Sequence, residues 1–184
     1  LKHSLRKRRI LITGASSGIG EALVTALSGR SNQLLLTARR RERLDSVVQQ
    51  AVASGSTALT VCGDITDPTV RNEILDFANQ QWGGIDVLIN NAGIGGIGTF
   101  ASADETRLRK IMEVNFFAPA ELIRSFLPAL MESDDPVIVN VGSVLGHFAV
   151  PKKSEYCASK FALHGLNYAL RMELTLEGID VLMI

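Results

Sequence analysis

The sequence has no long hydrophobic run, no net charge and few cysteines, and each absence argues against a class of protein. No apolar run approaches the roughly 18 residues that span a bilayer, so we expect no membrane span. Nineteen basic and nineteen acidic residues cancel, which argues against a nucleic-acid-binding protein. Cys62 and Cys157 have no metal-ligand spacing, so we expect no metal site and a reducing, cytoplasmic location.

The one marked charge imbalance lies at the N-terminus. The first nine residues hold five positive charges, at Lys2, Arg6, Lys7, Arg8 and Arg9. No apolar signal-peptide region follows them. We expect residues 1–8 to form a solvated basic tail, and weak attraction to anionic surfaces is the alternative.

The order of apolar segments predicts the fold. Short apolar runs typical of buried strands lie at residues 9–13, 33–38, 57–62, 85–89, 136–141 and 179–184. Between them, apolar residues recur at helical spacing at 19–29, 42–54, from Pro68 onward (with Asp67 as its cap), 104–131 and 154–177. This alternation predicts an α/β protein with a doubly wound parallel sheet, and 184 residues without a linker predict one domain over residues 1–184.

A glycine-rich segment, Thr-Gly-Ala-Ser-Ser-Gly-Ile-Gly at residues 13–20, lies between the first expected strand and helix. Gly14 allows a tight turn, Gly18 lets the backbone approach a phosphate, and Gly20 lets the helix pack closely. A helix N-terminus offers free N–H groups and partial positive charge to a pyrophosphate. Three residues separate the first two glycines, so the loop is wider than G-x-G-x-x-G. We predict a dinucleotide-binding loop, with an ordinary turn as the alternative.

The end of the second expected strand indicates which dinucleotide binds. A carboxylate there would accept from the ribose 2′-hydroxyl of NAD, but the strand runs into Arg39, Arg40 and Arg41 with no acid before Glu42. Guanidinium groups suit phosphate oxygens. We predict NADP(H) rather than NAD(H), with Arg39 on the 2′-phosphate and Arg40 supporting it. The alternative is an ordinary solvated helix start.

A tyrosine and a lysine lie four residues apart near the start of the last expected helix. Tyr156 and Lys160 therefore share a helical face. A free phenol titrates near pH 10, and a cation within about 4–6 Å favours its charged form. Such a pair is usable for general acid–base chemistry, although as a bare pair it is more often structural.

Further residues complete a pattern. The sequence resembles the short-chain dehydrogenase/reductase family, in its short single-domain branch, over nearly its whole length. The resemblance rests on the glycine loop, Asp64, Asn90-Asn91-Ala92-Gly93, Asn115, Ser143, Tyr156 and Lys160, in the family's order and spacing. It implies an NAD(P)-binding Rossmann fold.

The resemblance implies a role for each of four catalytic residues. Tyr156 would protonate the carbonyl oxygen as the nicotinamide delivers hydride, and Ser143 would polarise that oxygen. Lys160 would hold the nicotinamide ribose and tune Tyr156. Asn115 would kink its helix and place a water that relays protons to Lys160. These roles agree with the need to stabilise the negative charge that develops on one oxygen.

The resemblance also implies the cofactor contacts. Asp64 and Ile65 would hold the adenine, and Asn91-Ala92-Gly93 would line the cofactor. The complete expected set is Gly14, Ser16, Ser17, Gly18, Ile19, Gly20, Arg39, Arg40, Asp64, Ile65, Asn91, Ala92, Gly93, Tyr156 and Lys160. A substrate contact by His147 and a role for His164, one turn after Lys160, are weaker interpretations; an ordinary solvated His147 is the alternative.

These residues predict an NADP(H)-dependent oxidoreductase that transfers hydride between the nicotinamide and a small-molecule carbonyl or secondary alcohol. A catalytically silent NADP-binding module and an epimerase or dehydratase are the alternatives. Ala158, Ala162, Gly165 and Ala169 form a small-residue stripe that suits close packing on the sheet or in a dimer. By resemblance we expect a homodimer or homotetramer.

Family members normally continue past the sixth strand with a segment over the substrate, a helix and a strand. The sequence stops at Ile184, so we expect this C-terminal part to be missing. A shortened chain, an omitted disordered tail and a natural short form all stay open. The sequence does not encode the identity of the substrate.

Overall fold

The computed structural model describes residues 4–184, so the first three residues of the expected basic tail lie outside the described part. The strands are β1 (Arg9–Thr13), β2 (Gln33–Ala38), β3 (Thr57–Cys62), β4 (Val87–Asn90), β5 (Val137–Asn140) and β6 (Asp180–Met183). The helices are α1 (Gly18–Leu27), α2 (Arg41–Ala53), α3 (Pro68–Trp82), α4 (Glu105–Met112), α5 (Ala118–Met131) and α6 (Ser154–Glu173). Shorter turns are η1 (Phe100–Ser102), η2 (Glu113–Phe117) and η3 (Val144–Gly146).

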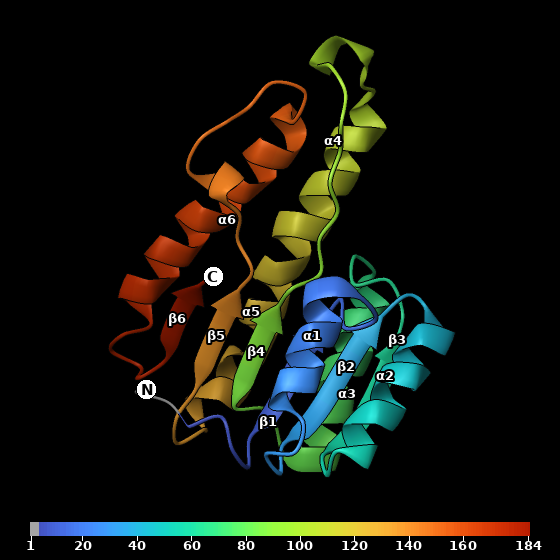
Figure 1. Ribbon diagram of the computed structural model, residues 1–184. Coiled ribbons are helices and arrows are strands. Elements are labelled where there is room, and N and C mark those ends of the chain that lie inside the picture. Colours follow the sequence, from blue (N-terminus) through green and yellow to red (C-terminus); the bar gives the residue numbers. More distant parts are fainter. Residues whose placement is uncertain (1–3) are drawn as a thin grey trace.

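The six strands form one parallel sheet in the order β3-β2-β1-β4-β5-β6. Helices α1 and α2 cover one face, and α3, α5 and α6 pack on the other, as Figure 1 shows. The strand order reverses between β1 and β4, where parallel sheets of this kind bind ligands beyond the carboxyl ends of the strands. The predicted doubly wound α/β fold is confirmed.

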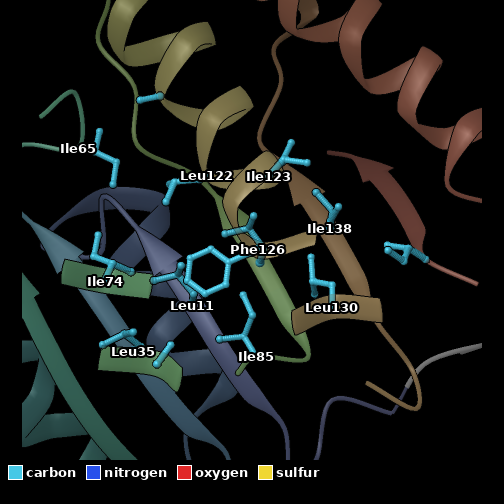
Figure 2. Packing of buried hydrophobic residues seen from close by; sticks show 14 of the residues in the cluster. Leu11, Leu35, Ile65, Ile74, Ile85, Leu122, Ile123, Phe126, Leu130 and Ile138 are labelled. Atoms are coloured by element: carbon cyan, nitrogen blue, oxygen red, sulfur yellow. The ribbon is translucent and has the colours of Figure 1, made fainter. Parts of the chain in front are cut away.

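The core explains why the strands read as continuous apolar runs. In β1, Leu11 packs into the cluster beneath α3 and α5, whereas Ile10 and Ile12 pack into the cluster beneath α1 and α2. Phe126 of α5 is fully buried and lies among Leu11 and other residues of the first cluster (Figure 2). Burial of each such side chain contributes about 1.5–3 kcal/mol.

Two helices differ from their expected bounds. The helix expected over residues 104–131 is interrupted by η2, a π-helical segment centred on Asn115. Helix α6 ends at Glu173 rather than at residue 177, and Gly178, with a φ of +71°, lies in the turn before β6. The cap at Asp67 is as expected, since its side chain accepts from the Thr69 N–H at 2.8 Å.

The expectation of a solvated tail is wrong for Arg8. Its side chain is 13% exposed and donates to the Asp135 carboxylate at 2.7 Å. Beside it, Arg9 of β1 pairs with Asp86. Burial alone would raise the pKa of Asp86, but hydrogen bonds from Arg9 and Ser133 outweigh it and hold that pKa below its usual value. The acidic residues before β4 and β5 thus hold the basic segment against the amino end of the sheet.

The described chain, residues 4–184, contains no helix with the length and apolar character that crossing a membrane requires.

Candidate active site

Two connected cavities lie at the carboxyl ends of the strands. A cleft of about 450 Å³ follows β1, β2 and β3, and a second cavity of about 490 Å³ lies between β4, β5 and the start of α6. Residues common to both linings are Ile19, Asn91, Gly93 and Ile94. Of the expected cofactor residues, all except Gly18 and Gly20 line one of these cavities.

The glycine loop has the expected close packing. Gly14 has a φ of +67°, and a Cβ there would lie 2.8 Å from the Ala92 Cα atom. A Cβ at Gly20 would lie 2.3 Å from the Gly14 carbonyl oxygen, so helix α1 begins directly against the loop. Gly18 has a φ of +57° and nothing within 4 Å of its Cβ position. The backbone at Gly18 is therefore open to an incoming group.

Arg40 is fixed across this loop. Its Nη2 atom donates to Ser16 Oγ at 3.1 Å and to Ser17 Oγ at 2.5 Å. Ser17 is the N-cap residue of α1, yet its side chain makes no capping hydrogen bond. The first N–H groups of α1 are therefore not satisfied by this cap, and they lie beside a guanidinium. Both features suit an anion.

Arg39 faces Asp64 at the other side of the cleft. Arg39 Nη1 lies 3.8 Å from Asp64 Oδ2, and the Arg39 side chain is 57% exposed. Asp64 Oδ1 accepts from the N–H and the hydroxyl of Thr66 at 3.0 and 2.9 Å. Burial would raise the pKa of Asp64, but these hydrogen bonds and the Arg39 charge outweigh it and lower that pKa. Asp64 is thus a charged acceptor at neutral pH.

Thr13 joins the glycine loop to the segment after β4. Its buried Oγ1 accepts from the N–H groups of Asn91 and Ala92 at 3.0 and 2.9 Å. The Asn91 side chain donates back to the Thr13 carbonyl at 2.9 Å. Sequence reasoning placed Asn91 and Ala92 in the site but gave Thr13 no role. The sequence feature that could have pointed to Thr13 was a hydroxyl at the end of an otherwise apolar strand.

Asn115 lies at the centre of the π-helical segment η2. Its Oδ1 accepts from the Ile94 N–H at 2.8 Å, and its Nδ2 donates to the Ile94 carbonyl and to Ser159 Oγ, both at 2.9 Å. The side chain is buried, and both of its amide hydrogens have acceptors on the protein. Asn115 therefore joins η2, the segment after β4 and helix α6. The placing of a water stays a prediction.

Ser143, Tyr156 and Lys160 line the second cavity together. Lys160 Nζ lies 5.9 Å from the centroid of the Tyr156 ring and donates to the Val141 carbonyl at 2.8 Å. Burial lowers the pKa of Lys160 to about 8. Ser143 Oγ accepts from the Leu145 N–H at 3.1 Å, so its own hydrogen remains available for donation.

A second lysine, Lys153, was missed. It lines the same cavity, and its Nζ also lies 5.9 Å from the Tyr156 ring centroid. It precedes α6 by one residue, where a lysine looks like an ordinary solvated group. Its position three residues before Tyr156 was the only signal in the sequence.

The first residue of α6 to be fully buried is an acid beside the tyrosine. The Glu155 side chain is 2% exposed, and its Oε1 accepts from Arg107 Nη2 of α4 at 2.7 Å. The hydrogen bond from Arg107 holds the pKa of Glu155 below its usual value. This ion pair joins α4 to the start of α6.

A line of three buried asparagines supports the site from below. Asn90 Nδ2 donates to Asn140 Oδ1 at 2.9 Å, and Asn140 Nδ2 donates to Asn167 Oδ1 at 2.9 Å. Asn90 and Asn140 are register partners at the ends of β4 and β5, and Asn167 comes from α6. The line fixes α6 relative to the sheet. It could be found from the sequence only with the strand register in hand.

The two histidines near the site have different surroundings. His147 is exposed and is not among the described residues that line the two cavities. Its ring packs edge-on against His164, with 4.3 Å between the ring centroids. His164 is 4% exposed. The structure therefore gives no support to a substrate contact by His147.

Comparison with known proteins identifies the family. A family model described as short chain dehydrogenase matches residues 8–184. An uncharacterized oxidoreductase of Staphylococcus saprophyticus is 33% identical over 179 residues, which cover 97% of this chain and 72% of that protein. Dehydrogenase/reductase SDR family member 7 of Homo sapiens is 36% identical over 177 residues, which cover 94% of this chain and 52% of that protein.

A solved structure gives the same answer. The crystal structure of a metagenomic short-chain oxidoreductase in complex with NADP is similar with a TM-score of 0.93 and 31% identity, covering 98% of this chain and 82% of that one. The match of the family model, residues 8–184, includes every expected site residue. The chain belongs to the short-chain dehydrogenase/reductase family.

Proposed function

We propose that the protein is an NADP(H)-dependent oxidoreductase that transfers hydride between the nicotinamide and a carbonyl or secondary alcohol of a small molecule. The observation that carries the proposal is that Ser143, Tyr156 and Lys160 line one cavity, which continues into the cleft behind the glycine loop. The NADP complex of the similar metagenomic oxidoreductase supports the choice of cofactor.

The cleft has the chemistry that this cofactor needs. The backbone at Gly14 and the uncapped start of α1 suit the pyrophosphate, and Arg39 and Arg40 suit the 2′-phosphate. Asp64 would accept from the adenine amino group, with Ile65 packing beside it. Lys160 would hold the nicotinamide ribose. When bound, the cofactor supplies or accepts the hydride.

During reduction, negative charge develops on the substrate oxygen, and two hydroxyl groups respond to it. The Ser143 hydroxyl, oriented by the Leu145 N–H, donates a hydrogen bond to that oxygen. The Tyr156 hydroxyl donates the proton that completes the alcohol. In many enzymes, preorganised donors of this kind make the largest single contribution to the rate enhancement. In oxidation, the same groups work in reverse.

Lys160 supplies a buried positive charge next to Tyr156. With a pKa near 8, it is mainly protonated at neutral pH and loses its charge above that value. The charge favours the phenolate that forms when Tyr156 gives up its proton. The rate of carbonyl reduction should therefore decline as the pH rises through about 8.

The test is a spectrophotometric screen for NADPH oxidation with a panel of aldehydes and ketones, repeated with NADH. The proposal expects turnover with at least one carbonyl compound and a preference for NADPH. A protein that binds NADPH but turns over no compound, even with alcohols and NADP⁺, would be a silent module and would contradict it. Isomer interconversion or water loss without net NADPH consumption would instead show an epimerase or dehydratase.

The proposal includes assembly with a second copy of the chain. Ala158, Gly165 and Ala169 of the small-residue stripe are exposed on α6, so the stripe does not pack on the sheet. Small residues permit the close approach of another helix. Analytical ultracentrifugation at micromolar concentration should show a dimer or tetramer, and only monomer would refute it. The cytoplasmic location stays a prediction; Cys62 and Cys157 are both free thiols.

A further inference from the structure

A buried histidine lies on the catalytic face of α6. Tyr156, Lys160 and His164 follow one another at intervals of four residues, so they share one side of the helix. His164 is 4% exposed, and neither ring nitrogen has a hydrogen-bond partner among the described residues. The proposed chemistry gives it no part. What the structure shows of His164 is the packing of its ring against the loop that carries Ser143.

The ring fills the space beneath the loop that carries Ser143. A Cβ at Gly142 would lie 2.7 Å from His164 Nε2, and a Cβ at Gly146 would lie 2.6 Å from His164 Cδ2. Both distances are far below van der Waals contact. The backbone on either side of Ser143 thus lies directly on the imidazole.

The backbone conformation does not explain the two glycines. Neither Gly142 nor Gly146 is among the glycines with positive φ, so other residues could adopt these angles. Gly142 is also crowded by Met183, whose sulfur would lie 2.5 Å from a Cβ. At Gly146, the three nearest atoms all belong to the His164 ring. The ring is therefore what excludes a side chain at Gly146.

The proposed chemistry requires a fixed distance between this loop and α6. Ser143 comes from the loop after β5, and Tyr156 comes from α6, yet both must reach one substrate oxygen. We propose that His164 is a positioning residue for Ser143: its ring sets the height of the Ser143 loop above the helix that carries Tyr156. This inference rests on the proposed function for the role of Ser143.

The first test compares two His164 substitutions by steady-state kinetics. His164→Ala removes the support, so kcat should fall on the order of tenfold to a hundredfold while the Kd for NADPH is unchanged. His164→Phe keeps a flat ring and should lose clearly less. In a Ser143→Ala background, His164→Ala should have little further effect on kcat, because a misplaced serine and a missing one are equivalent. Full additivity of the two substitutions would overturn the proposal.

The second test perturbs the contact between Gly146 and the His164 ring. Gly146→Ala should lower kcat and the Tm, because its methyl group collides with the ring, and adding His164→Ala should restore part of both. The Tm cycle needs no substrate, so it is independent of the proposed function. Additive Tm changes for Gly146→Ala and His164→Ala would overturn the positioning role, whereas the absence of turnover by the unaltered protein would overturn the function.

Discussion

The two halves of the sheet build their parts of the site by different means. Between β1 and β3, the cleft is formed by backbone groups and by side chains that reach in from the surface, such as Arg39 at 57% exposed. Between β4 and α6, the cavity is formed around buried polar side chains, and Lys160 is 6% exposed. A phosphate needs only accessible N–H groups and charges, whereas a reacting oxygen needs donors whose positions are fixed.

The hydrogen bonds of the two halves reflect this difference. In the catalytic half, Asn90, Asn140 and Asn167 form one buried line, and Asn115 bonds Ser159. Buried polar groups are costly unless paired, so such networks tolerate few arrangements. The cofactor half has no comparable line among the described residues. Substitutions there should change affinity, while those in the catalytic half should change rate or stability.

The largest effect is expected from removing the proposed general acid, Tyr156. Tyr156→Phe removes the proton donor and should lower kcat by about 10²–10⁴-fold. Binding of NADPH, measured by fluorescence, should be retained because the cofactor cleft is unchanged. Tyr168→Phe, on the exposed side of the same helix, is the control and should be nearly neutral. Equal turnover by Tyr156→Phe would remove Tyr156 from the chemistry.

The cofactor half is tested by reversing a charge. Arg39→Asp should lower the affinity for NADPH by about tenfold to a hundredfold, because a charge-assisted hydrogen bond is lost. It should also shift the cofactor preference toward NADH. The ratio of kcat/KM values for the two cofactors measures this. Arg43→Asp, exposed on α2, controls for the change in net charge. An unchanged ratio would show that Arg39 does not contact the 2′-phosphate.

The contribution of the three hydrogen-bonded asparagines is tested by measuring the stability of a variant that breaks their line. Asn140→Ala leaves the Asn90 amide and the Asn167 carbonyl oxygen without partners, and should lower the free energy of unfolding by about 2 kcal/mol. Urea denaturation measures the change. Asn72→Ala, exposed on α3, should stay within about 0.5 kcal/mol. Equal effects for the two variants would contradict the network's role.

The smallest effect is expected for the dependence of stability on pH through the titration of His164. Burial, followed by the charges of His147 and Lys160, lowers the pKa of His164 below its usual 6.5, so the folded protein holds it neutral. The unfolded chain then binds more protons than the folded one below about pH 6.5, and stability should decline as the pH falls through that range. His164→Phe should show a shallower decline in Tm between about pH 7 and 5. Parallel declines would show that His164 does not titrate there.

Sequence reasoning was most successful in the cofactor half, where local order is enough. The strand at residues 9–13, the glycine loop and the Asp67 cap were all read from neighbouring residues. Arg39 and Arg40 line the cleft, and their contact with the 2′-phosphate stays a prediction. The bonds from Arg40 to Ser16 and Ser17 cross between elements and have no local signal. The Arg8 pairing was missed for the same reason, because Asp135 is 127 residues away.

The catalytic half was only partly accessible from the sequence. The spacing of Tyr156 and Lys160 predicted a shared helical face, which the structure has. The asparagine line required the register of β4 and β5, and the contact of His164 with Gly146 required the packing of a loop on a helix. The apolar spacing predicted one helix over residues 104–131, whereas the resemblance predicted an irregularity at Asn115, which lies at the centre of η2.

The π-helical segment makes the length of the chain around Asn115 a part of the site. Successive residues of an α-helix lie about 100° apart around its axis, and a π turn inserts one extra residue into that count. Deleting one residue of 113–117 would remove that extra residue and let a regular helix run from α4 into α5 with little change in their relative rotation. The deletion would instead displace the Asn115 amide from its partners Ile94 and Ser159. The extra residue of η2 therefore serves to place one buried amide between the segment after β4 and α6.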